Sequence, residues 1–65
     1  MPIARISLYE GRTKEQKREL AEEITQSMVR IIGCTRESVN IIYDDIPRAD
    51  WVIGGAPETA VAKSG

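Results

Sequence analysis

The sequence predicts an α+β fold, in which a short β-α-β subunit with two parallel strands and one helix is followed by a small C-terminal hairpin or arm. Three observations predict this fold. Apolar and polar residues alternate near the N-terminus, apolar residues then recur every three to four positions, and a second alternating stretch follows. Because the chain has only 65 residues, residues 1–65 are expected to form a single domain.

The first strand is predicted at Pro2 to Leu8, where side chains alternate with the period of a half-buried strand. One face of this strand carries the apolar residues Ala4, Ile6 and Leu8. Ile3 lies on the opposite face, so that face is not purely polar. Both faces of the strand therefore carry apolar side chains that must be shielded from water.

The helix is predicted from Lys14 to about Ile32. Thr13-Lys14-Glu15-Gln16 fits a capping box, in which Thr13 is the N-cap and the side chain of Gln16 reaches back to it. Gly33 fits the residue after the helix end, where a left-handed backbone is common. The apolar stripe of the helix consists of Leu20, Ile24, Met28 and Ile31, with Ala21 and Ile32 alongside.

The second strand is predicted at Val39 to Tyr43, and it should run parallel to the first because a helix connects them. Ile46 to Asp50 is expected to be a loop. The apolar run Trp51 to Ile53 ends at Gly54-Gly55, which indicates a small hairpin or an arm onto a neighbouring subunit. Ala56 to Gly65 carries little pattern.

A homo-oligomer is expected because a single helix covers only one face of two strands. The other face carries Ile3 and Ile42, and a second copy of the chain is the simplest cover. A domain this short buries a small share of its surface and is marginally stable alone. The single cysteine, Cys34, has no partner within the chain for a disulfide. Partner subunits are the remaining source of stability.

Composition excludes several classes of function. The net charge of −1 offers no basic field for nucleic acid, and no apolar run approaches the roughly 20 residues of a membrane span. Without histidine, the chain lacks Ser-His-Asp chemistry and zinc sites of the usual spacing, so no metal is expected. One thiol and no signal-peptide pattern point to the cytoplasm. The remaining catalytic groups are carboxylates, arginines, tyrosines, the thiol and the chain terminus.

Pro2 is the candidate catalytic residue. Removal of Met1 would expose its nitrogen as a secondary amine, held in place by the ring and by the following strand. A terminal amine has a lower pKa than a lysine, and an apolar pocket or nearby arginines would lower that pKa further. Such a base suits proton abstraction near neutral pH. The structural alternative is a proline that merely starts an edge strand.

Three segments carry a resemblance to a known family: Pro2 to Ile6, Glu10 to Lys17, and Trp51 with Ile53-Gly54-Gly55. On these segments the chain resembles the 4-oxalocrotonate tautomerase family. The resemblance runs from Pro2 to about Gly55 without an evident gap. The two N-terminal segments at this spacing are fairly specific, whereas the Gly-Gly pair alone is weak.

The resemblance implies an isomerase without a cofactor, built from β-α-β subunits that commonly assemble as hexamers of dimers. Pro2 would act as general base and acid in keto-enol tautomerisation of a small 2-hydroxy-dienoate or related enol acid. Arg12 would bind the substrate carboxylate, for which the planar guanidinium is well suited. Trp51 would make the proline site apolar. The structural alternatives are a solvated loop arginine for Arg12 and an interface anchor for Trp51.

Asn40 departs from the family pattern. A well-known member has at this position a second arginine that stabilises negative charge on the substrate, whereas asparagine donates hydrogen bonds without a charge. Arg5, Arg36 and Arg48 are the candidates to replace this charge, and the sequence does not select among them. The departure leaves the substrate open between 2-hydroxymuconate, another dicarboxylate and a monoacid enol.

Two rival interpretations keep the same fold. One is hydration or dehalogenation of haloacrylate-type acids, which needs a positioned water and an extra acid or arginine. Its only candidates are Asp44 and Glu10, and adjacent Asp44 and Asp45 should point to opposite faces of the strand. The other is a non-catalytic oligomeric module in which Met1 is retained and the Pro2 nitrogen stays an amide. The sequence also leaves hexamer, trimer and dimer open.

Overall fold

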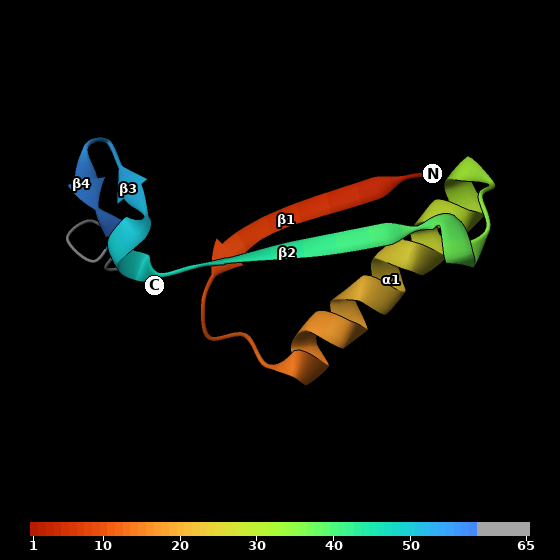
Figure 1. Ribbon diagram of the computed structural model, residues 1–65, viewed down its shortest axis with the longest axis horizontal. Coiled ribbons are helices and arrows are strands. Elements are labelled where there is room, and N and C mark those ends of the chain that lie inside the picture. The colour runs from red at the N-terminus through yellow and green to blue at the C-terminus, as the bar shows by residue number, and fades with distance from the viewer. Residues whose placement is uncertain (59–65) are drawn as a thin grey trace.

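The structure is a computed structural model that describes residues 1–58. Residues 59–65, most of the weakly patterned Ala56–Gly65 segment, lie outside the described residues. The elements are β1 (Ile3–Tyr9), α1 (Lys14–Ile32), the 3-10 turn η1 (Arg36–Ser38), β2 (Asn40–Ile46), the 3-10 turn η2 (Arg48–Asp50), β3 (Val52–Ile53) and β4 (Ala56–Pro57). Figure 1 shows β1 and β2 side by side, with the β3–β4 hairpin beyond one end of them.

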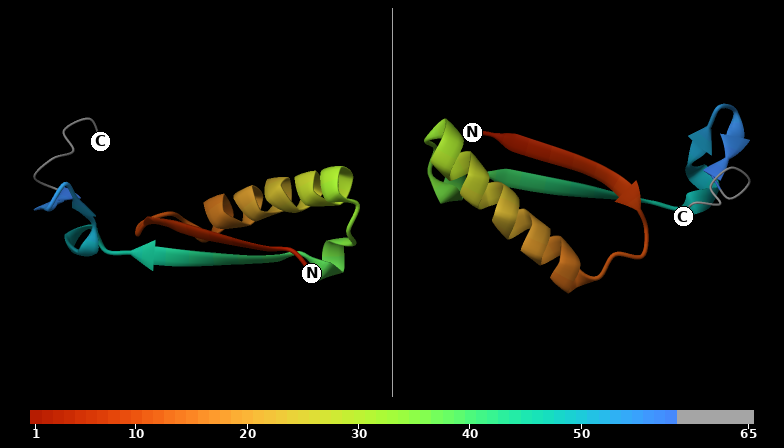
Figure 2. Two further views of the ribbon diagram at one scale, coloured as in Figure 1. Left: turned by 90° about the horizontal axis from the view of Figure 1, so that it is seen from above. Right: turned by 180° about the vertical axis from the view of Figure 1, so that it is seen from behind.

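β1 and β2 pair in parallel, with Ile3 opposite Asn40 and Tyr9 opposite Ile46. α1 crosses one face of this two-stranded sheet and leaves the other face open (Figure 2). The predicted β-α-β fold is therefore confirmed.

The predicted end of the second strand at Tyr43 was wrong, as was the assignment of Ile46 to a loop. β2 begins one residue later than predicted and continues to Ile46. The extension is stabilised because the backbone N–H of Glu10 donates to the Ile46 carbonyl over 3.0 Å. The Asp45 side chain also forms an ion pair with Lys17 of α1.

Both helix termini form as predicted. The Thr13 hydroxyl accepts from the Gln16 backbone N–H, and the Gln16 side-chain oxygen accepts from the Thr13 N–H, each over 3.0 Å. At the other end Gly33 adopts φ 86°, and its N–H donates to the Val29 carbonyl. This left-handed position suits glycine, which has no Cβ to clash there.

Tyr43 and Asp45 fix the first turn of the helix on the sheet. The Tyr43 hydroxyl donates to the backbone carbonyl of Lys17 over 2.7 Å. The Lys17 ammonium lies 5.9 Å from the centre of the Tyr43 ring and pairs with the Asp45 carboxylate. Because the bonds reach both the backbone and the side chain of Lys17, they set the position of α1 along β2.

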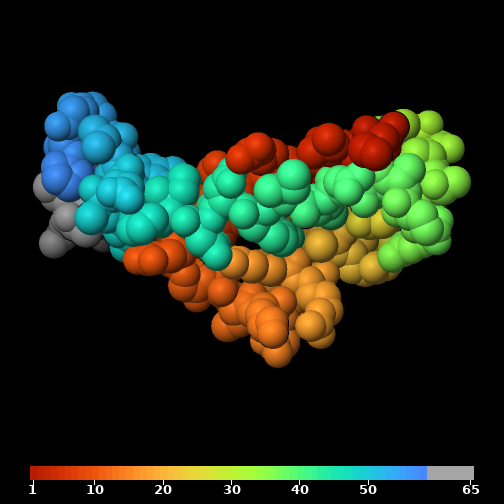
Figure 3. Space-filling view, in the orientation of Figure 1, coloured from red at the N-terminus to blue at the C-terminus, as the bar shows by residue number. Residues whose placement is uncertain are grey.

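On the open face of the sheet, apolar side chains are exposed to solvent. Ile3 is 59% exposed and Ile42 is 42% exposed, and no apolar side chain among residues 1–58 is fully buried. The chain is elongated (Figure 3), with a radius of gyration of 15.0 Å, against about 11 Å for a compact chain of this length. A lone subunit therefore lacks the buried apolar surface that stabilises a folded domain.

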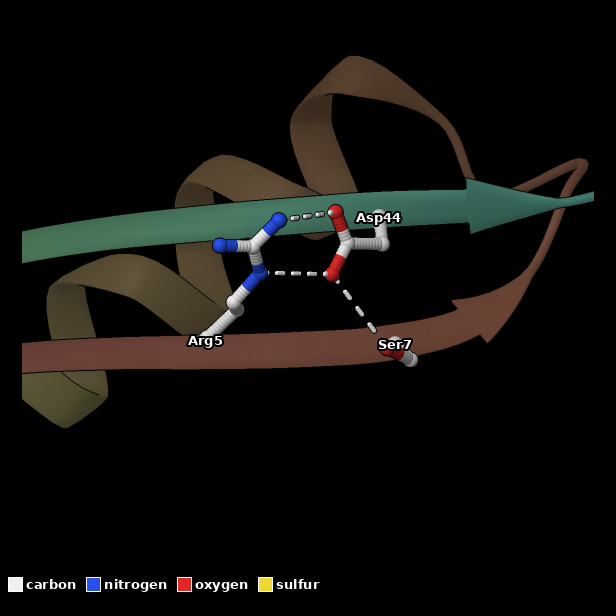
Figure 4. Close-up of polar contacts among 3 residues, drawn as sticks. All are labelled: Arg5, Ser7 and Asp44. Carbon is white, nitrogen blue, oxygen red and sulfur yellow. Dashed lines mark hydrogen bonds and ion pairs between the residues drawn. The ribbon is translucent and has the colours of Figure 1, made fainter.

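A polar network lies on the same open face. Arg5 donates through Nε to Asp44 Oδ2 over 3.1 Å, and the Ser7 hydroxyl donates to the same oxygen over 3.3 Å (Figure 4). The hydrogen bond from Arg5 lowers the pKa of the Asp44 carboxyl below its usual value. Asp44 and Asp45 thus point to opposite faces, as predicted, and neither forms part of a paired carboxylate site.

The C-terminal segment is a hairpin rather than an extended arm. β3 and β4 are antiparallel, with Ile53 opposite Ala56. Gly54 and Gly55 form the turn with φ of 60° and 85°, the signs required by a type I′ turn. None of the described helices is long and apolar enough to cross a membrane.

Thr13→Ala should lower the free energy of unfolding by about 1 kcal/mol, because the N-cap hydroxyl satisfies an otherwise unpaired helix N–H. Urea denaturation at one fixed protein concentration would measure the change, since partner binding makes stability depend on concentration. Thr35→Ala is the matched control, because Thr35 precedes η1 without a side-chain capping bond. Equal losses in the two variants would contradict the capping role.

Asp44→Asn should reduce the loss of the free energy of unfolding that occurs as the pH falls below about 4. Because the folded-state pKa of Asp44 is lowered, its stabilisation is complete above the unfolded pKa of about 4 and is lost as pH falls through the folded value. Urea midpoints measured from pH 6 down to pH 2.5 would show this difference. Asp50→Asn, which removes an exposed carboxylate with no ion pair among residues 1–58, should retain the wild-type slope.

Candidate functional site

Pro2 and Asn40 lie together at the start of the parallel ladder. The Asn40 backbone N–H donates to the Pro2 carbonyl over 3.0 Å, and the Asn40 side-chain amide donates to the Ser38 carbonyl over 3.1 Å. Pro2 is half-buried, whereas Met1 is 88% exposed. In the unprocessed chain the Pro2 nitrogen is an amide, so it becomes basic only when Met1 is removed.

Arg12 and Trp51 lie near the opposite end of the ladder. Arg12 lines a shallow pocket of about 340 Å³ with Leu8, Tyr9 and Arg48. The Trp51 ring packs against the Tyr9 ring, with a centroid distance of 4.3 Å and an interplanar angle of 54°. This end therefore combines aromatic surface with two guanidinium groups.

The four predicted site residues form two half-sites within one subunit. We call Pro2 and Asn40 the proline half-site, and Arg12 and Trp51 the arginine half-site. β1 separates them, and its seven residues span about 20 Å at roughly 3.3 Å per residue. One subunit alone does not bring the proline nitrogen and Arg12 to one small substrate.

The arginines weighed as replacements for the charge missing at Asn40 differ in their surroundings. Arg5 is bonded to Asp44 on the open sheet face. Arg36 is bonded through Nη2 to Glu22 over 2.7 Å, which raises the Arg36 pKa and lowers that of Glu22. Only Arg48 of the three lines the pocket that contains Arg12.

The sequence did not identify two residues that lie beside the arginine half-site, Tyr9 and Glu58, as members of the candidate site. Tyr9 was weighed as a general acid or a packing residue, with packing preferred, and its ring contacts both Trp51 and the Arg48 guanidinium, whose carbon lies 4.3 Å from the ring centre. Glu58, which accepts from Arg48 Nη1 over 2.8 Å, was not considered. No local pattern identifies Glu58, because the contact depends on the hairpin bringing it back to η2.

An apolar hollow that lies away from both half-sites is found on α1. It has a volume of about 370 Å³ and is lined by Glu23, Ile24, Ser27, Met28, Ile31 and Ile32. Its only ionisable lining group is Glu23, and neither half-site contributes to it. No group of three or more potential metal ligands occurs among residues 1–58. The proline and arginine half-sites therefore remain the candidate catalytic and substrate-binding groups.

Comparison with known proteins agrees with this architecture. The model of the Tautomerase family, described as tautomerase enzyme, matches residues 2–60. A probable tautomerase from Ralstonia nicotianae is 42% identical over 60 residues, which cover 92% of this chain and 86% of the relative. The 2-hydroxymuconate tautomerase of Comamonas testosteroni is 36% identical over 55 residues, covering 85% and 87% of the two chains.

Solved structures give the same result. A 4-oxalocrotonate tautomerase isozyme from Methylibium petroleiphilum superposes with a TM-score of 0.84 at 42% identity, covering 95% of this chain and all of that one. A heterohexamer 4-oxalocrotonate tautomerase from Chloroflexus aurantiacus superposes with a TM-score of 0.85 at 29% identity, with the same coverage. The chain is thus an enzyme that belongs to the 4-oxalocrotonate tautomerase family of the tautomerase superfamily.

Proposed function

We propose that this tautomerase converts a small 2-hydroxy-dienoate or related enol acid into its keto form, with Pro2 as both base and acid. The observation that carries the proposal is the position of Pro2 at the first residue before β1, where its carbonyl already bonds to β2. That bond holds the residue in place while leaving the nitrogen at the chain end after Met1 is removed. A relative named 2-hydroxymuconate tautomerase supports the reaction class.

In the proposed reaction the Pro2 amine removes the hydroxyl proton of the enol. The oxygen lone pair forms the carbonyl, and the carbon–carbon π electrons take a proton from the prolinium at the far carbon of the enol system. The amine is regenerated, and atoms and charge balance without an added reagent. Pro2 supplies both transfers because its basic form and its acid form are both accessible when its pKa lies near the working pH.

Assembly would join the two half-sites. Pro2 and Arg12 lie about one strand length apart in a subunit, so the proline half-site of one copy must meet the arginine half-site of another. We propose a homo-oligomer for this reason, with a hexamer as its form, in keeping with the hexameric relative. In that arrangement Trp51 and Tyr9 would surround the amine of a neighbouring copy, and an apolar setting would lower its pKa.

Arg12 would hold the substrate carboxylate in this joined site. It forms no hydrogen bond or ion pair with any other residue among 1–58, so its donors are available to a ligand. Asn40 would contribute a neutral donor beside Pro2, since its amide now bonds to the Ser38 carbonyl through only one of two N–H groups. Hydration or dehalogenation is less well supported, because Asp44 is already engaged by Arg5 and Ser7.

Processed Pro2→Ala protein should lose about a hundredfold of the ketonisation rate of 2-hydroxymuconate, because a primary amine on a rotatable residue replaces the ring-held secondary amine and is no longer fixed in the reacting geometry. The reaction is followed by ultraviolet absorbance, with an intact mass that confirms loss of Met1 from both proteins. Circular dichroism should show that the variant stays folded. Unchanged turnover would contradict the role of the ring-held proline amine as the base.

The outcome for the wild type also separates the alternatives. Turnover in processed protein, and none in protein that retains Met1, would support the amine mechanism over the non-catalytic module. Processed wild type that turns over neither 2-hydroxymuconate nor a monoacid enol would contradict the proposed reaction.

Sedimentation at low protein concentration should show assembled subunits or unfolded chain, and no folded monomer. Ile42→Asp should shift the population away from the assembly, because it replaces an exposed apolar side chain of the open sheet face with a charge that a neighbouring copy would have to bury. Thr35→Asp adds the same charge at an exposed position before η1, where aspartate is a favourable N-cap, and should leave assembly unchanged. A stable folded monomer of the wild type would overturn the oligomer.

A further inference from the structure

Arg48 is held at the pocket wall from two sides. Its guanidinium carbon lies 4.3 Å from the centre of the Tyr9 ring, within the range of a cation–π contact. Its Nη1 donates to Glu58 Oε2 over 2.8 Å, and the Glu58 side chain is only 5% exposed. The Glu58 backbone N–H in turn donates to the Trp51 carbonyl over 2.8 Å. The hairpin and the end of β1 together restrict where the guanidinium lies.

Most of the Arg48 donor groups are still unused. An arginine has five N–H donors in a planar fork, and among residues 1–58 only Nη1 donates to another side chain. The Arg48 side chain is 44% exposed, and it lines the same pocket as Arg12. The remaining N–H groups can therefore reach a ligand without giving up the bond to Glu58.

The charge of the pocket favours an anion even with Glu58 present. Arg12 and Arg48 contribute two positive charges, and the buried Glu58 carboxylate offsets one of them. The ring of Tyr9 and the side chain of Leu8 form the rest of the wall. A carboxylate held against this apolar wall would make stronger charge-assisted bonds than it would in bulk water.

We propose that Arg48 is a second substrate-binding arginine, which shares with Arg12 the carboxylate of the enol acid and supplies the cation that is missing at Asn40. This role deepens the proposed function, because it assigns the acid group of the substrate to the Arg12–Arg48 pocket. Glu58 is then a positioning residue, which orients Arg48 without touching the substrate. Arg5 and Arg36 do not share this role, because their ion pairs hold them on other surfaces and neither lines the pocket with Arg12.

The test measures binding rather than turnover, so it is independent of whether Pro2 performs tautomerisation. Adipate, a non-reacting dicarboxylate, is titrated into the assembled, processed protein, and binding is followed by the fluorescence of Trp51, the single tryptophan of the chain. Adipamide, the neutral diamide of the same length, measures binding that does not depend on charge. Arg48→Gln, which removes the charge but keeps a donor for Glu58, should weaken adipate binding at least tenfold and leave adipamide binding unchanged.

Arg18→Gln is the matched control, since Arg18 is exposed on α1 and its loss changes the net charge equally. It should leave the dissociation constant of adipate within about twofold, because Arg18 does not line the pocket and salt screens a solvent-exposed charge. Equal weakening in Arg18→Gln and Arg48→Gln, or no weakening in Arg48→Gln, would overturn the proposal.

A second measurement needs no substitution at Arg48 and covers the case in which Arg48→Gln fails to fold. In wild-type protein, adipate should shift the side-chain Nε–H resonances of Arg12 and Arg48 and leave that of Arg5 in place. A shift confined to Arg12 would contradict a shared carboxylate site. Glu58→Gln should weaken adipate binding less than Arg48→Gln does, because Tyr9 still contacts the guanidinium, and a greater loss would contradict its positioning role.

Discussion

A sheet of two strands has two faces, and residues 1–58 contain one α-helix to cover them. α1 covers one face, and Ile3 and Ile42 on the other stay exposed. This single constraint accounts for the absence of any fully buried apolar side chain among residues 1–58, and for an extent of 43 Å along the longest axis. The free energy of folding must then come in large part from contact between copies, as it does for many very short domains.

The pairing of the two strands also determines where the groups of the candidate site lie. A parallel pair of strands places the N-terminal residues of both at one end, which is why Pro2 and Asn40 are neighbours. The connections that follow the strands meet at the other end, which is where Arg12, Arg48 and the hairpin gather. The paired strands thus hold the proline and arginine half-sites at a fixed separation within one subunit. Assembly of several copies, rather than local motion, would bring the two half-sites together.

Local signals allowed most of the fold to be predicted. The capping box at Thr13 and the glycine at position 33 determined both ends of α1, because each satisfies specific helix-terminal groups or backbone angles. The end of β2 was mispredicted because Asp44 and Asp45 are poor strand formers by themselves. Their ion pairs with Arg5 and Lys17, which come from distant parts of the sequence, keep them in the ladder.

The candidate site was predictable in its residues but not in its geometry. Pro2, Arg12, Asn40 and Trp51 came from the resemblance to a family, while their division into two half-sites depends on the length of β1. The contact of Tyr9 with Trp51 and Arg48, and the bond of Arg48 with Glu58, arise only when η2 and the hairpin fold back. No periodicity or motif in the sequence encodes those distances.

The bond between Asn40 N–H and the Pro2 carbonyl has a consequence for maturation. The ladder begins after the Met1–Pro2 peptide bond, and Met1 extends into solvent, so cleavage of that bond removes no element of the fold. An uncleaved subunit would therefore fold as a mature one does while carrying an inert amide. In a mixed assembly the fraction of competent sites would follow the completeness of aminopeptidase action, which would make N-terminal processing a graded control of specific activity.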